Sequence, residues 1–449
     1  MTDTIVGIAT AAGEGGVAIV RLSGDEAVAI FEKAFKPRRR TSPFESHRLM
    51  LGNVVDEDGM IDEAMGVVMY APNSYTREDV CEIHTHGGSV AASLVVKQLI
   101  RLGARPAEAG EFTRRAFMNG RIDLMQAEAV MGVISAQSQA ALKAEESQLN
   151  GGQSLFIRRA QEKLTGLLAG LEAHIDYPDE IDEEEALVGL NEGLNSLIGM
   201  LEGAIDERGA RIVREGLRVA LFGRPNAGKS TLFNALLGEE RAIVTNIPGT
   251  TRDVLEGSFQ LDGVQVIVLD TAGLRESGDE VERIGVERAH AAITRADAAL
   301  LLLDASTEMT AEERDLLAMS MNCPCCVLMN KEDAGEKTSF SEVEELTAHR
   351  PILPIFAQNG EGLDQVRQWL RGFLRKPSEW MLTHERHMSV ARQVLEKLKQ
   401  ARSGLALEQP LDLAAVDLHE ALYLLGCITG DSVDEQLLDD IFSRFCVGK

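Results

Sequence analysis

The sequence predicts a multidomain protein in which an α+β domain precedes a discontinuous α-helical bundle domain, and a mostly parallel α/β domain is inserted into that bundle. The length of 449 residues, at ~150 residues per domain, predicts about three domains. Short strand patterns give way to helical spacing near residue 121, and strands alternate with helices further along the chain. The expected boundaries are 1–120 for the first domain, 121–215 and 376–449 for the two halves of the helical domain, and 216–375 for the inserted domain.

Composition and charge restrict the class of protein. Hydrophobic residues make up 45% and charged residues 26% of the chain, which is typical of a folded globular protein. The formal net charge of −26 argues against a dedicated nucleic-acid binder, because such a chain repels polyphosphate unless a partner supplies positive surface. The N-terminus lacks a basic region followed by an apolar one, and apolar runs such as Ala298–Leu303 are far too short to span a membrane. We therefore expect a cytoplasmic protein.

The six cysteines have no spacing typical of a disulfide framework, so reduced thiols are expected. Cys323-Pro-Cys325-Cys326 lacks further ligands nearby, and the apolar residues after it indicate a buried strand. His84 and His86 share one face of a predicted strand, but without an evident third ligand we interpret them as packing residues.

The first two domains are predicted from periodicity. Residues 17–20 and 65–70 read as strands separated by Gly and Asn-Ser turns. Leucines spaced by three and four residues up to Ile175 predict a long amphipathic helix, which ends near Pro178. The acidic run 179–185 is interpreted as a solvated loop or a helix start, before helical spacing resumes from Leu187 to about Ala210.

The inserted domain begins with the motif that carries its chemistry. The apolar strand 218–222 leads directly into Gly223-Arg-Pro-Asn-Ala-Gly-Lys-Ser230, which fits G-x-x-x-x-G-K-[ST], and a helix is expected over 231–237. Backbone N–H groups of such a loop surround phosphates, Lys229 reaches the β and γ oxygens, and the Ser230 hydroxyl ligates Mg²⁺. A P-loop nucleotide site is therefore expected here.

Three further segments follow in the order that a guanine-nucleotide domain requires. Gly249-Thr-Thr-Arg-Asp253 is a candidate switch in which Thr251 completes the Mg²⁺ shell, and Asp270-Thr-Ala-Gly273 is a second candidate switch. Asn330-Lys-Glu-Asp333 follows an apolar strand, and its last carboxylate can accept both N–H donors of guanine. GTP is therefore favoured over ATP. The last base-contact loop keeps Ala357 but has Phe356 where serine is expected, which leaves the support of this loop open.

The group that orients the attacking water is not fixed by these motifs. In Ras-like proteins a glutamine follows D-x-x-G, whereas this chain has Leu274, which cannot polarise water. The acidic candidates downstream are Glu276, Asp279, Glu280 and Glu282.

The sequence resembles the MnmE (TrmE) family of tRNA-modification GTPases over essentially its whole length. The resemblance is carried by the motifs above, by Leu274-Arg-Glu276 followed by Asp279-Glu-Val-Glu-Arg-Ile-Gly285, and by the C-terminal Cys446-Val-Gly-Lys449. Further matching segments are 13–17, 20–24, 73–76, 78–80, 86–88, 110–112, 123–124 and 126–129.

This resemblance implies an N-terminal domain that binds 5-formyl- or 5,10-methylene-tetrahydrofolate and pairs two subunits, and an inserted GTP-binding G domain. It also implies a potassium-activated GTPase that modifies C5 of the wobble uridine of certain tRNAs to aminomethyl or carboxymethylaminomethyl uridine. The family acts with an FAD- and NADH-dependent partner, MnmG (GidA), and tRNA is expected to bind mainly through that complex.

The resemblance also assigns residues. Glu282 would orient the attacking water, and Cys446 is a candidate in the modification chemistry. Mg²⁺ would be held by Ser230 and Thr251, and K⁺ by Asn226, Thr245, Ile247 and Thr250. Folate would be bound by Arg21, Glu82, Arg121 and Lys449; the family often has lysine at position 121. The expected GTP site comprises Asn226, Ala227, Gly228, Lys229, Ser230, Thr231, Thr245, Asn246, Ile247, Pro248, Gly249, Thr250, Thr251, Asp270, Thr271, Ala272, Gly273, Asn330, Lys331, Asp333, Phe356, Ala357 and Gln358.

The alternative hypothesis is a ribosome-assembly or RNA-docking GTPase switch without modification chemistry. A stand-alone RNA binder is expected to carry a basic module, and the sequence has none. The charge balance therefore favours the partnered enzyme.

Overall fold

The computed structural model describes residues 3–39, 43–179, 183–238, 255–270, 292–319, 323–331, 337–347, 350–374 and 380–449, with backbone only at 183–186, 255–256, 270 and 319. Close contacts divide the chain into two compact units. The first contains Met1–Met131, Gln148–Ile198 and Val390–Lys449, and the second contains Gly132–Ser147 and Gly199–Ser389.

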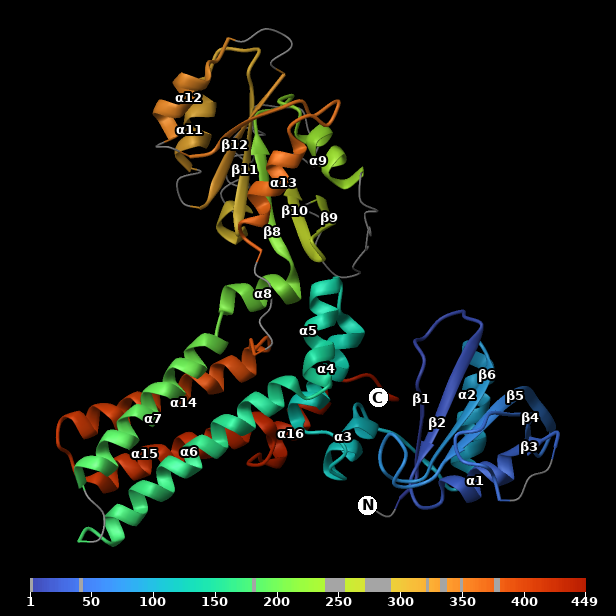
Figure 1. Ribbon diagram of the computed structural model, residues 1–449. Helices are drawn as coiled ribbons and strands as arrows, with labels where there is room; N and C mark the ends of the chain where they lie inside the picture. Colours follow the sequence, from blue (N-terminus) through green and yellow to red (C-terminus); the bar gives the residue numbers. More distant parts are fainter. Residues whose placement is uncertain are drawn as a thin grey trace. The chain divides into compact units, whose positions relative to one another are not determined.

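The first unit contains a seven-stranded sheet in the order β3-β4-β5-β6-β2-β1-β7 (Figure 1). All its pairs are antiparallel except β1 with β7. Helices α1 and α2 bury Phe31 and Leu99 against the apolar side chains of one sheet face, including Val20 and Ile83. The elements are β1 Ile5–Ile8, β2 Val17–Ser23, α1 Ala27–Ala34, β3 Phe35–Pro37, β4 Met50–Asp56, β5 Gly59–Met69, β6 Val80–His86, α2 Ser89–Arg101 and β7 Arg105–Pro106.

Long helices make up the rest of the first unit. The predicted leucine stripe lies on α6, where Leu164, Leu168 and Leu171 are buried, and α6 packs along α15. Helix α7 begins at Glu183, so the acidic run includes a helix start. The helices are α3 Glu111–Met118, α4 Leu124–Ser135, α6 Gly152–Asp176, α7 Glu183–Ala204, α14 Glu385–Ala406, α15 Leu411–Thr429 and α16 Glu435–Phe442; α4, α7 and α14 each continue into the second unit.

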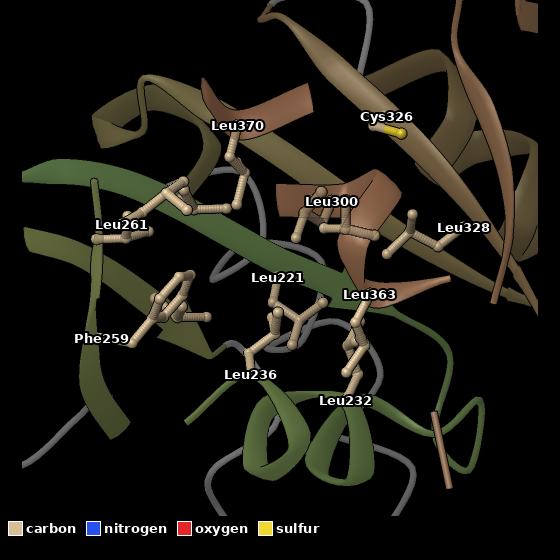
Figure 2. Packing of buried hydrophobic residues seen from close by; sticks show 14 of the residues in the cluster. Leu221, Leu232, Leu236, Phe259, Leu261, Leu300, Cys326, Leu328, Leu363 and Leu370 are labelled. Carbon is tan, nitrogen blue, oxygen red and sulfur yellow. The ribbon is translucent and has the colours of Figure 1, made fainter. Parts of the chain in front are cut away.

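The second unit contains a six-stranded sheet in the order β13-β12-β11-β8-β10-β9, in which β9 alone is antiparallel to its neighbour. Leu232 of α9 and Leu363 of α13 cover one face, where Figure 2 shows them beside Leu221 of β8. Helices α11 and α12 cover the other face. The elements are α5 Gln139–Leu149, α8 Glu207–Glu215, β8 Leu217–Gly223, α9 Lys229–Gly238, β9 Leu255–Leu261, β10 Val264–Asp270, β11 Ala298–Asp304, α11 Ala311–Met319, β12 Cys325–Asn330, α12 Phe340–Thr347, β13 Ile352–Ile355 and α13 Leu363–Arg371.

The predicted fold class is confirmed: an α+β sheet domain, long helices and a mostly parallel α/β domain are all present. Cys325 and Cys326 are buried in β12, as the apolar pattern indicates. Within the described ranges, none of the helices combines the length and the apolar character needed to cross a membrane.

Candidate nucleotide site and second ligand site

The phosphate loop connects β8 to α9 at the carboxyl end of a central parallel strand. Gly223 has φ +148°, and a Cβ atom there would lie 2.3 Å from the Leu302 carbonyl oxygen of the neighbouring strand, so no side chain fits. Gly228 has φ +105°. Helix α9 begins at Lys229, earlier than the sequence indicates, so the N–H groups of its first turn face the loop. This is the geometry in which a helix N-terminus binds phosphate.

The Lys229 side chain is held within this loop. Its Nζ donates hydrogen bonds to the carbonyl oxygens of Gly223 at 2.6 Å and Arg224 at 2.7 Å. The residue is buried, whereas Ser230 and Asn226 are exposed at the loop surface. Asn226 has φ +63°, so its backbone adopts the left-handed conformation that asparagine tolerates.

Asn330 ties the phosphate loop to the loop that follows β13. Its Nδ2 donates to the Ala227 carbonyl at 2.8 Å, and its Oδ1 accepts from the Ala357 N–H at 3.2 Å. The Asn330 side chain is buried, so these bonds have no water to replace them. Through Asn330, three segments of the predicted GTP site come together.

Lys331 lies beside the same loop. Its Nζ donates to the Asn226 carbonyl and to Asp304 Oδ2, both at 2.7 Å. Burial opposes ionisation of Asp304, but hydrogen bonds from Lys331 and Ser306 outweigh it and lower the pKa of this carboxyl below its ordinary value. The negative charge at the end of β11 therefore fixes the Lys331 ammonium, a contact that the sequence motifs do not indicate.

Phe356 does not open the base-contact loop. Its N–H donates to the Glu361 carbonyl at 2.9 Å, and its side chain is half-buried, while Gln358 is exposed. Ala357 is buried and keeps its bond to Asn330. The substitution of serine by Phe356 is therefore compatible with a closed loop.

Several predicted residues lie outside the described ranges. These are Thr245, Asn246, Ile247, Pro248, Gly249, Thr250, Thr251, Thr271, Ala272, Gly273, Glu282 and Asp333, and the side chain of Asp270 is likewise not described.

A second site is built on the sheet of the first unit around Arg21 and Glu82. These residues face each other across β2 and β6, and the Arg21 Nε donates to Glu82 Oε1 at 2.8 Å. His84 Nε2 lies 3.1 Å from the other carboxylate oxygen. Burial opposes ionisation of Glu82, but Arg21 and His84 outweigh it and lower the pKa of this carboxyl. An ionised acceptor is thus fixed at this face of the sheet.

Aromatic rings flank the Arg21 guanidinium. Its Cζ lies 5.2 Å from the Tyr75 ring centroid and 5.7 Å from that of Phe112. The Arg121 Cζ lies 4.8 Å from the Tyr75 centroid, and Arg121 Nη1 donates to the Tyr75 carbonyl at 3.1 Å. Tyr75 therefore brings together two of the predicted folate residues, Arg21 and Arg121, through cation–π contacts.

The C-terminal tail reaches this site. Val447 pairs with Ala109, and Arg21 Nη1 donates to the Gly448 carbonyl at 3.4 Å. Gly448 has φ +101°, and a Cβ atom there would lie 2.1 Å from the Ile8 carbonyl oxygen. Cys446 is exposed. At the end of the tail, the backbone N–H of Lys449 donates a hydrogen bond to the Cys446 carbonyl at 3.2 Å.

The histidine interpretation needs correction. The His86 side chain is 74% exposed and its Nδ1 lies 2.8 Å from Asp62 Oδ1, so it is not a packing residue. His84 is half-buried and contacts Glu82. Among the described residues, no group of three or more His, Cys, Asp or Glu side chains is arranged to hold a metal ion.

Sequence reasoning did not assign roles to Tyr75, Phe112, Asp304 and Gly448, and it interpreted His84 as a packing residue rather than as a partner of Glu82. Tyr75 and Phe112 lie within matching segments, and His84 follows Glu82 on the same strand face, so position alone could have suggested them. Gly448 also lies within a matching segment, the C-terminal Cys446-Val-Gly-Lys449, whereas for Asp304 the local sequence carries no such signal.

The parallel sheet, the glycine-containing loop at the end of β8 and the buried lysine define a P-loop nucleotide-binding protein. A family model described as MnmE helical domain matches residues 124–446, and one described as GTP-binding protein TrmE N-terminus matches residues 4–121. The chain belongs to the MnmE family.

Curated relatives agree with this assignment. The tRNA modification GTPase MnmE of Streptococcus thermophilus is 42% identical, covering 100% of this chain and 98% of the relative. That of Listeria welshimeri is 41% identical, covering 100% and 99%. Among solved structures, a variant of Aquifex aeolicus Era bound to GDP and aluminium fluoride is 28% identical over 40% of this chain and 65% of that chain, with a TM-score of 0.29.

Proposed function

We propose that this GTP hydrolase of the MnmE family is activated by potassium and modifies C5 of wobble uridine in certain tRNAs, together with an FAD- and NADH-dependent partner of the MnmG (GidA) type. The observation that carries the hydrolase assignment is the phosphate loop, with Lys229 buried in it and Asn330 joining it to the loop after β13. Membership of the family supports tRNA as the substrate. We assign it to the cytoplasm.

Bound at this loop, GTP and Mg²⁺ would supply the phosphoryl chemistry. The α9 N-terminus and Lys229 would bind the phosphates, and the exposed Ser230 hydroxyl would be a Mg²⁺ ligand, with Thr251 as a second. Asp333 would select guanine. The carboxamide of Asn226 is exposed on the loop and is an oxygen donor of the kind that K⁺ prefers. We place K⁺ there, with Thr245, Ile247 and Thr250 as the other ligands, and Glu282 as the residue that orients water.

The Arg21–Glu82 site fits a tetrahydrofolate, which would supply a one-carbon unit. The ionised Glu82 accepts paired N–H donors of a pterin, Arg21 and Arg121 suit its carbonyl or glutamyl groups, and Tyr75 offers an aromatic face. The tail places Gly448 against Arg21, so Lys449 and the exposed Cys446 are candidates at this site. The carrier would be 5-formyl- or 5,10-methylene-tetrahydrofolate.

We also propose a homodimer in which the N-terminal domains pair. Val17, Val90 and Leu94 are large apolar side chains with exposures of 50%, 71% and 42%, and we propose that the interface covers them. Because the net charge is −26, tRNA is expected to bind mainly through the partner complex. We keep the proposed domains at 1–120, 121–215 with 376–449, and 216–375.

Hydrolysis measured in matched KCl and NaCl buffers tests the proposal. We expect a strong preference for potassium at unchanged GTP affinity, because a cation held by Asn226 would stabilise the negative charge that develops during phosphoryl transfer. Asn226→Gly is a suitable variant, since glycine keeps the left-handed backbone at φ +63° and removes only the carboxamide. It should bind GTP and lose the potassium preference. Equal rates in both salts by the wild-type protein would contradict the proposal and favour an RNA-docking switch.

A further inference from the structure

The hairpin formed by β9 and β10 in the second unit adjoins both candidate switches in the chain. Strand β9 begins four residues after Thr251, and β10 ends at Asp270, so the two candidate switches are continuous with its two strands. The strands pair without interruption from Leu255↔Asp270 to Leu261↔Val264. Asp262 and Gly263 both have positive φ, at +51° and +81°, and form the tight two-residue turn at the other end. An uninterrupted ladder therefore joins the ends next to the two candidate switches to the turn.

The helix that follows the phosphate loop also contacts this hairpin. Gly257 of β9 lies so close to α9 that a Cβ atom there would be 2.6 Å from Phe233 Cζ and 2.8 Å from Leu237 Cδ1. Among the strands that the structure describes, β9 lies at the edge of the sheet and pairs with β10 alone. The hairpin is therefore continuous in the chain with both candidate switches and also packs against α9.

The tip of the hairpin is bound to the N-terminus of α5. The Ala140 N–H donates to the Gly263 carbonyl at 2.8 Å, and Gln260 Nε2 donates to the Gln137 carbonyl at 3.2 Å. Ser138 caps α5 by accepting from the Ala141 N–H at 3.0 Å, which leaves the Ala140 N–H available for the hairpin. The first turn of α5 therefore bonds directly to the tip.

Helix α5 has further attachments along its length. Ala144 packs with Val213 and Met381, and Glu145 Oε2 lies 3.0 Å from His384 Nε2, all within the second unit. At its C-terminal end α5 passes into the first unit, where the Gln148 Nε2 donates to the Met125 carbonyl at 2.7 Å and the Leu149 carbonyl accepts from Gln126. Helix α5 is thus bonded to the β9–β10 hairpin at its N-terminal end and to α4 at its C-terminal end.

We propose that α5 is the element through which the nucleotide state of the G domain reaches the helical domain, and that the Ala140–Gly263 and Gln260–Gln137 hydrogen bonds are its input contact. The inference rests on the proposed GTPase function. A change at either switch shifts the β9–β10 ladder, the tip changes its bonds to the first turn of α5, and the far end of the same helix responds at Gln148.

Hydrogen exchange of the full-length protein, compared with GDP and with a non-hydrolysable GTP analogue, tests this. In the wild-type protein we expect the exchange of residues 139–149 to differ by about fivefold between the two nucleotides, the factor expected from one net hydrogen bond. Ala140→Pro removes the N–H that reaches Gly263, and should abolish the difference while leaving GTP affinity and hydrolysis unchanged.

Gln139→Pro is the matched control. Residue 139 is the first helical position after the Ser138 cap, where proline is tolerated, and the Ala140 N–H remains. This variant should keep the nucleotide-dependent difference. Because proline at position 140 also constrains Gln139, Gln260→Ala provides a second way to weaken the contact without touching the helix. It should reduce the difference.

The outcomes separate the two proposals. A wild-type protein that does not bind guanine nucleotides would overturn the proposed function. A protein that binds and hydrolyses GTP but shows the same α5 exchange in both states, or keeps the difference in both Ala140→Pro and Gln260→Ala, would overturn the coupling role alone.

Discussion

Asn330 offers the sharpest test of the nucleotide site, because one buried side chain supports two loops. Asn330→Ala removes the donor to the Ala227 carbonyl at 2.8 Å and the acceptor of the Ala357 N–H at 3.2 Å, so both backbone groups lose the side-chain partner that the described residues give them. Each such buried group costs about 1–3 kcal/mol, so the change should cost about 2–6 kcal/mol in total. Because a nucleotide binds only when both loops are ordered, we expect part of this free-energy cost to appear as weaker GDP binding. Each ~1.4 kcal/mol of the cost that appears in binding weakens GDP affinity tenfold.

Titration with a fluorescent GDP analogue measures the loss of GDP affinity. Thermal unfolding with and without GDP measures the loss of stability. Asn330→Asp keeps the acceptor for Ala357 but sets a carboxylate oxygen against the Ala227 carbonyl, so it should weaken binding without freeing the loop after β13. Asn359→Ala is the control, since that exposed side chain bonds only its neighbour Glu361 among the contacts described. If Asn330→Ala binds GDP like the wild type and unfolds at the same temperature, the bridging role of Asn330 is wrong.

Three further predictions concern Glu82, Cys446 and Glu282. Glu82→Gln should weaken 5-formyl-tetrahydrofolate binding, measured by calorimetry. The pKa of Glu82 in the folded protein lies below its ordinary value. Its contribution to stability is therefore fully present above the unfolded-state pKa and is lost as the pH falls through the lower folded-state pKa. If the difference in free energy of unfolding between the wild type and Glu82→Gln does not shrink on acidification, this reasoning is wrong. A thiol reagent should modify the exposed Cys446 first, while burial raises the pKa of Cys326 to about 12 and protects it; Cys446→Ser should remove the fast phase. Glu282→Ala should keep GTP affinity and lose most turnover, and normal turnover in this variant would reject that assignment.

The α/β domain could be predicted well because its signals are local. The continuous apolar run from Ala298 becomes the buried strand β11, which a parallel sheet covered on both faces requires. The glycine pattern from Gly223 to Gly228 fixes the loop by sterics that involve few other residues. The start of α9 was less well predicted, because a loop residue such as Lys229 can also begin a helix when its N–H groups are left for a ligand.

The contacts between distant segments could not be predicted in this way. Asp304 reaches Lys331 only because β11 and β12 are neighbours in register, with Asp304 opposite Asn330. Nothing near residue 304 in the sequence indicates this partner. The register is decided by the packing of the whole sheet, and the side chains at its carboxyl edge meet as a consequence.

The Arg21–Glu82 site of the first unit depends on contacts between segments that lie far apart in the sequence. Arg21 and Glu82 are opposite each other only in the observed pairing of β2 with β6; a shift of one residue would turn one of them to the other face of the sheet. Gly448 arrives from the end of the chain, and its lack of a side chain matters only because the Ile8 carbonyl lies against it. Composition and periodicity indicate neither the pairing of β2 with β6 nor the close approach at Gly448. Family resemblance can indicate both, because it compares positions that occupy the same places in related chains. The resemblance could therefore propose Arg21, Glu82 and Lys449 as site residues, while the contacts of the Tyr75 ring with both Arg21 and Arg121 became evident only from the three-dimensional arrangement.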